Sequence, residues 1–66
     1  MHIRLNGMIR EVPDGITISR LLETLALGTH QVVVQLNTDI VRREQYPDRV
    51  LLSDDAIEIL TFSPGG

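Results

Sequence analysis

The chain is 66 residues long, carries a formal net charge of −3 at pH 7 and contains no cysteine. A chain of this length forms at most one domain, so we expect a single domain over residues 1–66 with no deep substrate cavity. The lack of cysteine excludes disulfides, cysteine nucleophiles and thiolate metal sites. Two isolated histidines, His2 and His30, are too few for a zinc site, and we expect no bound metal or cofactor and no catalytic residues.

The charged and aromatic residues argue against nucleic-acid partners, and the apolar runs are too short for a membrane span. All six cationic residues are arginines, and the chain has one Phe and one Tyr. A mildly acidic domain of this kind lacks the cations that neutralise phosphates and the rings that stack on bases, so we expect no nucleic-acid partner. No apolar run approaches the ~20 residues of a membrane span and no signal peptide is recognisable, so we expect a cytoplasmic protein with no membrane contact.

The chain begins with the pattern of a β-hairpin. Residues 1–5 alternate, with Ile3 and Leu5 on one face. Asn6-Gly7 follows, and this pair is typical of a type I′ turn, which needs a positive φ at both central residues. The return strand covers residues 8–12.

The alternation leaves the facing of this return strand open. Met8, Arg10 and Val12 share one face, whereas Ile9 falls on the other. We expect the aliphatic stem of Arg10 to lie along the edge of the core with its guanidinium in water.

A helix is predicted after a Pro-Asp-Gly turn at residues 13–15. Four apolar residues then recur at helical spacing, which gives the helix one buried stripe: Ile18, Leu21, Leu22 and Leu25. Thr17 is the expected N-cap. Gly28 is expected to end the helix in the left-handed conformation.

The second half of the chain predicts further strands. In residues 31–37, Val32, Val34 and Leu36 would face the helix. A short strand at 40–41, an irregular stretch at 42–49 with at most one helical turn, and a last strand at 56–62 complete the pattern. Because so small a domain has little apolar surface to bury, we expect nearly every apolar residue to be inside.

This order of elements favours one fold. The helix lies between the second and third strands, so the sheet must be mixed, and we expect the first and last strands to pair in parallel at its centre. The predicted class is α+β, a ubiquitin-like β-grasp with a mixed sheet of four to five strands and one helix packed across it.

The last four residues, Ser63-Pro64-Gly65-Gly66, follow the final strand directly. Glycine is costly to order and adds no packing, so this diglycine does not stabilise a fold. A tail without Cβ atoms can instead enter a narrow channel and present its carboxylate, over a reach of at most ~13–14 Å. Pro64 would stiffen the base of this flexible tail. Alone, Gly65-Gly66 is only a weak indication of a working tail, because a frayed terminus could have the same sequence. After a β-grasp pattern it is a strong indication.

Over its whole length the sequence resembles the ThiS family, the sulfur-carrier proteins of bacterial thiamine biosynthesis. More distantly it resembles the small subunit of molybdopterin synthase and ubiquitin. The resemblance rests on Asn6-Gly7, Val12-Pro13-Asp14-Gly15, Thr17, Leu21-Leu22, residues 32–37, residues 41–46 and Gly65-Gly66. The family often has Pro at the position of Arg42, and Gly at the positions of Thr38 and Asp55.

The resemblance implies a carrier, a protein cosubstrate that is not itself an enzyme. An E1-like adenylyltransferase (ThiF-like) would use ATP and magnesium to adenylate the carboxylate of Gly66. A sulfur donor such as a cysteine desulfurase would then give a thiocarboxylate, and a thiazole synthase (ThiG-like) would take the sulfur. Alternatives are a carrier for molybdopterin or another sulfurated product, and a non-catalytic β-grasp interaction module with an inert tail.

The last strand also predicts a surface for these partners. If Ile57 and Ile59 point inward, Leu60 and Phe62 point outward beside the tail. Exposed apolar residues next to a reactive tail indicate a partner-binding patch. The alternative is that Phe62 folds over the sheet edge and completes the core.

Overall fold

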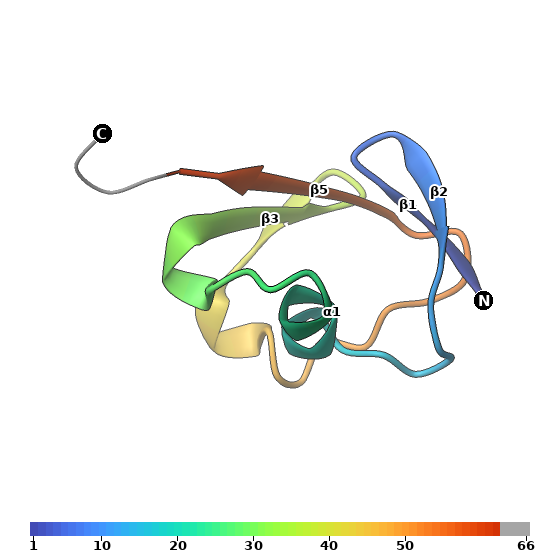
Figure 1. Cartoon of the computed structure of the whole chain (residues 1–66), viewed down its shortest axis with the longest axis horizontal. Coiled ribbons are helices and arrows are strands. Elements are labelled where there is room, and N and C mark those ends of the chain that lie inside the picture. Colours follow the sequence, from blue (N-terminus) through green and yellow to red (C-terminus); the bar gives the residue numbers. More distant parts are fainter. Residues whose placement is uncertain (63–66) are drawn as a thin grey trace.

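Five strands form one mixed sheet, and one helix covers its inner face (Figure 1). The computed structural model describes residues 1–62. The strands are β1 (His2–Leu5), β2 (Met8–Glu11), β3 (Val32–Leu36), β4 (Asp39–Val41) and β5 (Ala56–Thr61), and the helix is α1 (Ile18–Thr24). Two 3₁₀ turns, Thr29–Gln31 and Arg43–Gln45, join them. The predicted β-grasp class is confirmed.

The last strand lies in the middle of the sheet. The strand order is β2-β1-β5-β3-β4. β5 pairs in parallel with β1 and antiparallel with β3, which confirms the expected parallel pairing of the first and last strands. The strand predicted over residues 31–37 is therefore internal and lies beside the centre.

The first two strands form the predicted hairpin. Asn6 and Gly7 have φ of 50° and 85°, as a type I′ turn requires. Opposed residues of an antiparallel pair share a face, and Arg10 lies opposite Ile3, whereas Ile9 lies opposite Arg4. Arg10 is thus on the core side, as expected, and Ile9 is on the outer side. Every residue of this edge strand is exposed.

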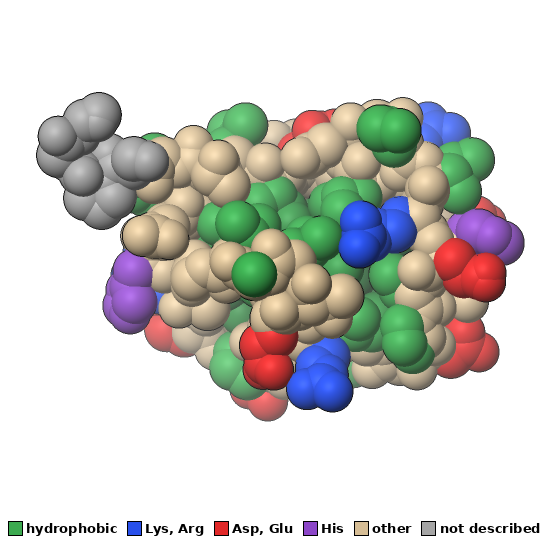
Figure 2. Space-filling model, viewed as in Figure 1, with side chains coloured by type: hydrophobic (Ala, Val, Ile, Leu, Met, Phe, Trp, Pro, Cys, Tyr) green, Lys and Arg blue, Asp and Glu red, His purple; other side chains and the backbone are tan. Residues whose placement is uncertain are grey.

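The core fills the space between α1 and the sheet. Figure 2 shows hydrophobic side chains gathered there, with most charged side chains at the rim. Its buried members are Ile3, Val12, Ile16, Ile18, Leu21, Leu22, Val32, Val34, Leu36, Val41, Tyr46, Leu51, Ile57 and Ile59. The irregular stretch contributes to the core through Tyr46, which the sequence pattern did not indicate.

The expectation that nearly every apolar residue would be inside is wrong. Among residues 1–62, seven large apolar residues are exposed: Met8, Ile9, Ile40, Val50, Leu52, Leu60 and Phe62. The physical reason is that one short helix covers only the inner face of five strands. Apolar residues of the outer face and of the edge strand have no second layer to pack against.

The helix begins where predicted and ends earlier than predicted. The Thr17 hydroxyl accepts a hydrogen bond from the Arg20 N–H at 3.1 Å, which confirms the N-cap. The left-handed residue after the helix is Ala26 (φ 58°), whereas Gly28 has φ −80° and opens the first 3₁₀ turn. The prediction for Gly28 is therefore wrong.

The earlier end is explained by a Schellman motif. The N–H groups of Ala26 and Leu27 donate to the carbonyls of Glu23 and Leu22, at 3.0 and 2.9 Å. This arrangement lets Leu27 pack against the core. A hydrophobic contact outweighs the preference for glycine at the left-handed position.

Turn geometry also explains how this chain tolerates its departures from the ThiS pattern. The left-handed residues of the two turns are Asn37 (φ 59°) and Asp54 (φ 69°), so Thr38 and Asp55 do not need to be glycine. Arg42 has φ −72° and ψ 144°, a conformation that proline also adopts.

Within residues 1–62 there is no helix of the length and apolar character that a bilayer crossing needs.

Candidate functional site

The central strand carries the predicted partner-binding residues. Ile57 and Ile59 point into the core, with exposed fractions of 0% and 6%, whereas Leu60 and Phe62 are 63% and 51% exposed. This facing is the one that the alternation predicted. The alternative in which Phe62 completes the core does not fit a side chain with half of its surface exposed. The other predicted site residues, Pro64, Gly65 and Gly66, lie outside the described residues.

Two further apolar residues extend this surface across the outer face of the sheet. Val33 lies directly opposite Leu60 in the β3–β5 pairing. Ile40 of β4 lies opposite Gln35, on the same outer face, and is 63% exposed. We call Val33, Ile40, Leu60 and Phe62 the outer patch. The alternation of residues 31–37 already placed Val33 outward, but the contribution of Ile40 was not predicted.

The side chain of Asn6 bonds to the middle of β5. Its Oδ1 accepts a hydrogen bond from the Ile59 N–H at 2.7 Å, and its Nδ2 donates to the Ile59 carbonyl at 3.3 Å. The Asn6 main-chain N–H donates to the Ile57 carbonyl at 2.8 Å. The sequence identified Asn6 only as a turn residue.

Asn37 bonds in a similar way to the start of β5. Its main-chain N–H donates to the Ala56 carbonyl at 2.6 Å, and its Oδ1 accepts from the Ala56 N–H at 3.1 Å. Its Nδ2 donates to the Asp55 carboxylate at 3.3 Å. Asparagine is one of the few residues that enter the left-handed region readily, and that preference at a strand end is the only sequence signal for either contact.

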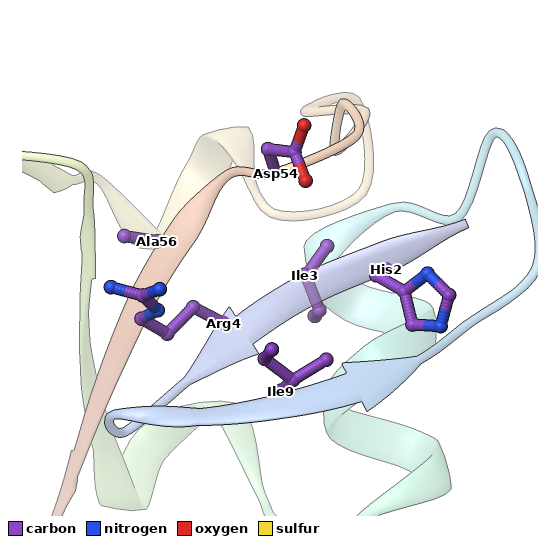
Figure 3. A pocket seen from close by; sticks show the side chains of 6 residues that line it. All are labelled: His2, Ile3, Arg4, Ile9, Asp54 and Ala56. Carbon is purple, nitrogen blue, oxygen red and sulfur yellow. The ribbon is translucent and has the colours of Figure 1, made fainter.

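A shallow hollow of about 530 Å³ opens on the outer face at the other end of β5 (Figure 3). Its lining residues are His2, Ile3, Arg4, Ile9, Asp54 and Ala56. In Figure 3 the imidazole of His2, the guanidinium of Arg4 and the carboxylate of Asp54 lie at separate corners and do not converge. We therefore assign no chemistry to this hollow.

The titratable side chains of residues 1–62 are dispersed. No three His, Asp or Glu side chains in this range gather as metal ligands would. His2 and His30 are both exposed, as expected for ordinary surface residues. The geometry therefore directs attention to the end of β5 and the outer patch.

Comparison with known proteins decides the family. The ThiS family model matches residues 3–66. The chain belongs to the ThiS family. It is 35% identical to the sulfur carrier protein ThiS of Bacillus subtilis over 65 residues, which cover 97% of this chain and 98% of that protein.

Other relatives are longer. A thiazole synthase of Magnetococcus marinus is 38% identical over all 66 residues, and one of Paramagnetospirillum magneticum is 30% identical. The chain spans 20% of the length of each of these two proteins. The similarity therefore concerns one segment of each thiazole synthase.

The fold agrees with solved ThiS-family structures. The crystal structure of the thiamine biosynthesis protein ThiS from Geobacter metallireducens superposes with a TM-score of 0.85 at 29% identity, over 100% of both chains. Its solution structure gives a TM-score of 0.82 and matches 88% of that chain. The resemblance in the sequence to the ThiS family, the sulfur-carrier proteins of thiamine biosynthesis, is thus confirmed.

Proposed function

We propose that this carrier holds its sulfur on the carboxyl group of Gly66, as a thiocarboxylate. The observation that carries the proposal is the family match, which runs through residue 66 and thus includes Gly65-Gly66. The central strand supports the proposal, because β5 leads toward these residues and is paired with β3 as far as Thr61. Glycine has no Cβ, so such a tail fits a channel that is too narrow for other residues.

The chemistry requires activation by a partner. A free carboxylate is an anion at neutral pH and resists nucleophiles. We propose that an E1-like adenylyltransferase binds ATP and magnesium and lets a Gly66 oxygen attack the α-phosphorus, so that pyrophosphate leaves. The terminal sulfur of a donor such as a cysteine desulfurase persulfide then displaces AMP from the acyl carbon. A thiol attacks the donor's other sulfur, which breaks the S–S bond, forms a disulfide with the donor and leaves the thiocarboxylate. The carrier supplies the acyl group, and its partners supply the catalytic groups and the closed site that excludes water.

We propose thiazole synthase as the acceptor of the sulfur. Two proteins named thiazole synthase contain a segment related to this whole chain. A carrier-like segment and a thiazole synthase in one polypeptide support a productive contact between the two. A cytoplasmic location is part of the same proposal, because the activation step consumes ATP.

The outer patch is the proposed docking surface for these partners. Val33 lies beside Leu60 toward the tail end of β5, Ile40 lies further back, opposite Gln35, and Leu60 and Phe62 belong to the segment that leads into the tail. An apolar surface beside the reacting group would hold a partner where the tail can reach its active site. Under this proposal the chain is a cosubstrate and not itself an enzyme.

Intact-protein mass spectrometry tests the proposal. The chain is incubated with ATP, magnesium, an E1-like adenylyltransferase and a sulfur donor, and the expected product has one oxygen replaced by sulfur. Deletion of Gly66 should abolish loading while leaving the melting temperature unchanged, because residue 66 follows the core elements. A chain with one extra glycine is the matched control for composition, since it moves the carboxylate by ~3.3–3.6 Å and should load poorly.

Three results would contradict the proposal or one of its parts. Sulfur loading that survives the deletion of Gly66 would exclude this carboxylate. Partner binding without any ATP-dependent adenylation, unaffected by loss of Gly65-Gly66, would instead indicate an interaction module. Transfer of sulfur to a molybdopterin synthase large subunit, and not to thiazole synthase, would reject the proposed acceptor.

A further inference from the structure

Two asparagines hold the central strand at two different points. Asn6 and Asn37 each follow the end of a strand, and each has a positive φ, of 50° and 59°. Each turns its carboxamide onto the backbone of β5, Asn6 at Ile59 and Asn37 at Ala56. One contact thus lies at the start of β5, and the other lies nearer the tail.

The Asn6 side chain replaces a missing part of the β1–β5 ladder. In that parallel pairing, the N–H of Arg4 donates to the Asp55 carbonyl and the N–H of Asn6 donates to the Ile57 carbonyl. The next bond of a parallel ladder would run from the Ile59 N–H to the main-chain carbonyl of Asn6. The chain turns away at Asn6 for the hairpin, and Oδ1 accepts this bond at 2.7 Å instead.

The Nδ2 group of Asn6 completes the substitution. It donates to the Ile59 carbonyl, a role that a further residue of β1 would fill if the strand continued. A carboxamide has the same donor and acceptor pair as a peptide group, which explains why one side chain can satisfy both groups. Ile59 is therefore bonded on the β1 side by Asn6 and paired on the other side with Val34 of β3.

We propose that Asn6 is a positioning residue for the transfer reaction. This inference rests on the proposed role of Gly66. With β5 held at Ile59 by Asn6 and at Phe62 by the bond of its N–H to the Gln31 carbonyl (3.1 Å), the tail beyond residue 62 can extend ~13–14 Å at most. Loss of the Asn6 contact frees one side of the strand end, so the carboxylate samples a larger volume and is less often aligned in the partner's site.

Substitution by glycine isolates the side chain, because glycine accepts the positive φ without strain. Asn37→Gly is the matched control, since it also removes a left-handed asparagine that bonds to β5, but at the end remote from the tail. Asn6→Asp keeps the acceptor for the Ile59 N–H, replaces the donor with a second oxygen that faces the Ile59 carbonyl, and adds a negative charge. Loading kinetics are measured with the adenylyltransferase, ATP and magnesium, below the melting temperature of every variant.

We expect Asn6→Gly to lower the kcat of adenylation roughly tenfold while KM for the carrier changes less than twofold, because Leu60 of the outer patch keeps its pairing with Val33 of β3. Asn37→Gly should leave both parameters at the wild-type values, and Asn6→Asp should recover most of kcat. Equal kcat values for the two glycine variants would overturn the inference, because a purely structural role would affect both variants alike.

Amide hydrogen exchange provides a readout that does not depend on loading. In Asn6→Gly the amides of Ile59 and Phe62 should exchange faster, whereas in Asn37→Gly the Phe62 amide should keep its protection. Unchanged exchange at Phe62 in Asn6→Gly would overturn the inference, since the strand end would then be held without Asn6. Failure of the wild-type chain to load would reject the proposed function, and the exchange comparison would still decide whether Asn6 holds the strand end.

Discussion

The two faces of the sheet use similar side chains for different purposes. On β5, Ile57 and Ile59 are buried under α1, whereas Leu60 is 63% exposed on the outer face. The residues are all aliphatic and lie within four positions of one another. The comparison teaches that hydrophobicity alone does not assign a residue to the core of this domain, and that the side of the strand decides whether a residue stabilises the fold or remains available to a partner.

The largest effect is expected on the inner face. Ile57→Ala should lower the free energy of unfolding by about 2–5 kcal/mol, because it leaves a cavity at a fully buried position. Chemical denaturation measures the loss, and Ile57→Val should lose only about 0.5–1.5 kcal/mol. A loss for Ile57→Ala that is no larger than that for Ile57→Val would break the distinction between the two faces.

A change on the outer face should affect partner binding and leave stability nearly intact. Leu60→Thr should change the free energy of unfolding by no more than about 0.5 kcal/mol. It should raise KM for the carrier in sulfur loading roughly tenfold, or about 1.4 kcal/mol, because one apolar contact with the partner is lost.

The matched control for this prediction is Ile9→Thr. Ile9 is 71% exposed on the same outer face but belongs to the edge strand β2, outside the outer patch. It should load with an unchanged KM. If Ile9→Thr and Leu60→Thr raised KM equally, the docking surface would extend over the whole outer face and the outer patch would lose its special role.

A smaller gain is expected at the end of the helix that covers the inner face. Ala26 has φ 58°, so Ala26→Gly should raise the free energy of unfolding by about 0.5–1 kcal/mol. Thermal unfolding measures the gain. A loss of stability would mean that the unfolded-state entropy of glycine outweighs the relief of strain at this position.

The smallest effect is expected at Arg42, between β4 and the second 3₁₀ turn. Its φ of −72° suits proline, so Arg42→Pro should gain about 0.4 kcal/mol by restricting the unfolded chain. The shift is measured by urea denaturation. The loading kinetics should not change, and a marked destabilisation would show that the Arg42 N–H or side chain has a role in the fold.

Local patterns in the sequence predicted most of the fold. The Asn6-Gly7 turn, the Thr17 cap and the inward facing of Ile57 each depend on neighbours close in the chain, and each is confirmed. The predicted end of the helix was wrong, because the packing of Leu27 against the core outweighed the local preference for a glycine, Gly28, at the left-handed position that ends a helix.

The candidate site was less accessible to sequence reasoning. The contact between Asn6 and Ile59 joins residues 53 positions apart, and no local pattern contains it. The outer patch was half predicted, since strand alternation fixes the facing of Leu60 but does not tell which strand will lie beside it. The role of Gly66 came from the family resemblance and remains a prediction.

The central position of β5 has a consequence for how the chain folds while it is being synthesised. Without β5 the sheet separates into two unconnected hairpins, β2-β1 and β3-β4, because β5 is the only strand that contacts both within residues 1–62. A ribosome makes β5 after all the other strands, so the two halves must wait for it before they can join. An incomplete chain therefore has two unjoined hairpins with exposed strand edges, and its backbone is open to proteases until β5 is added.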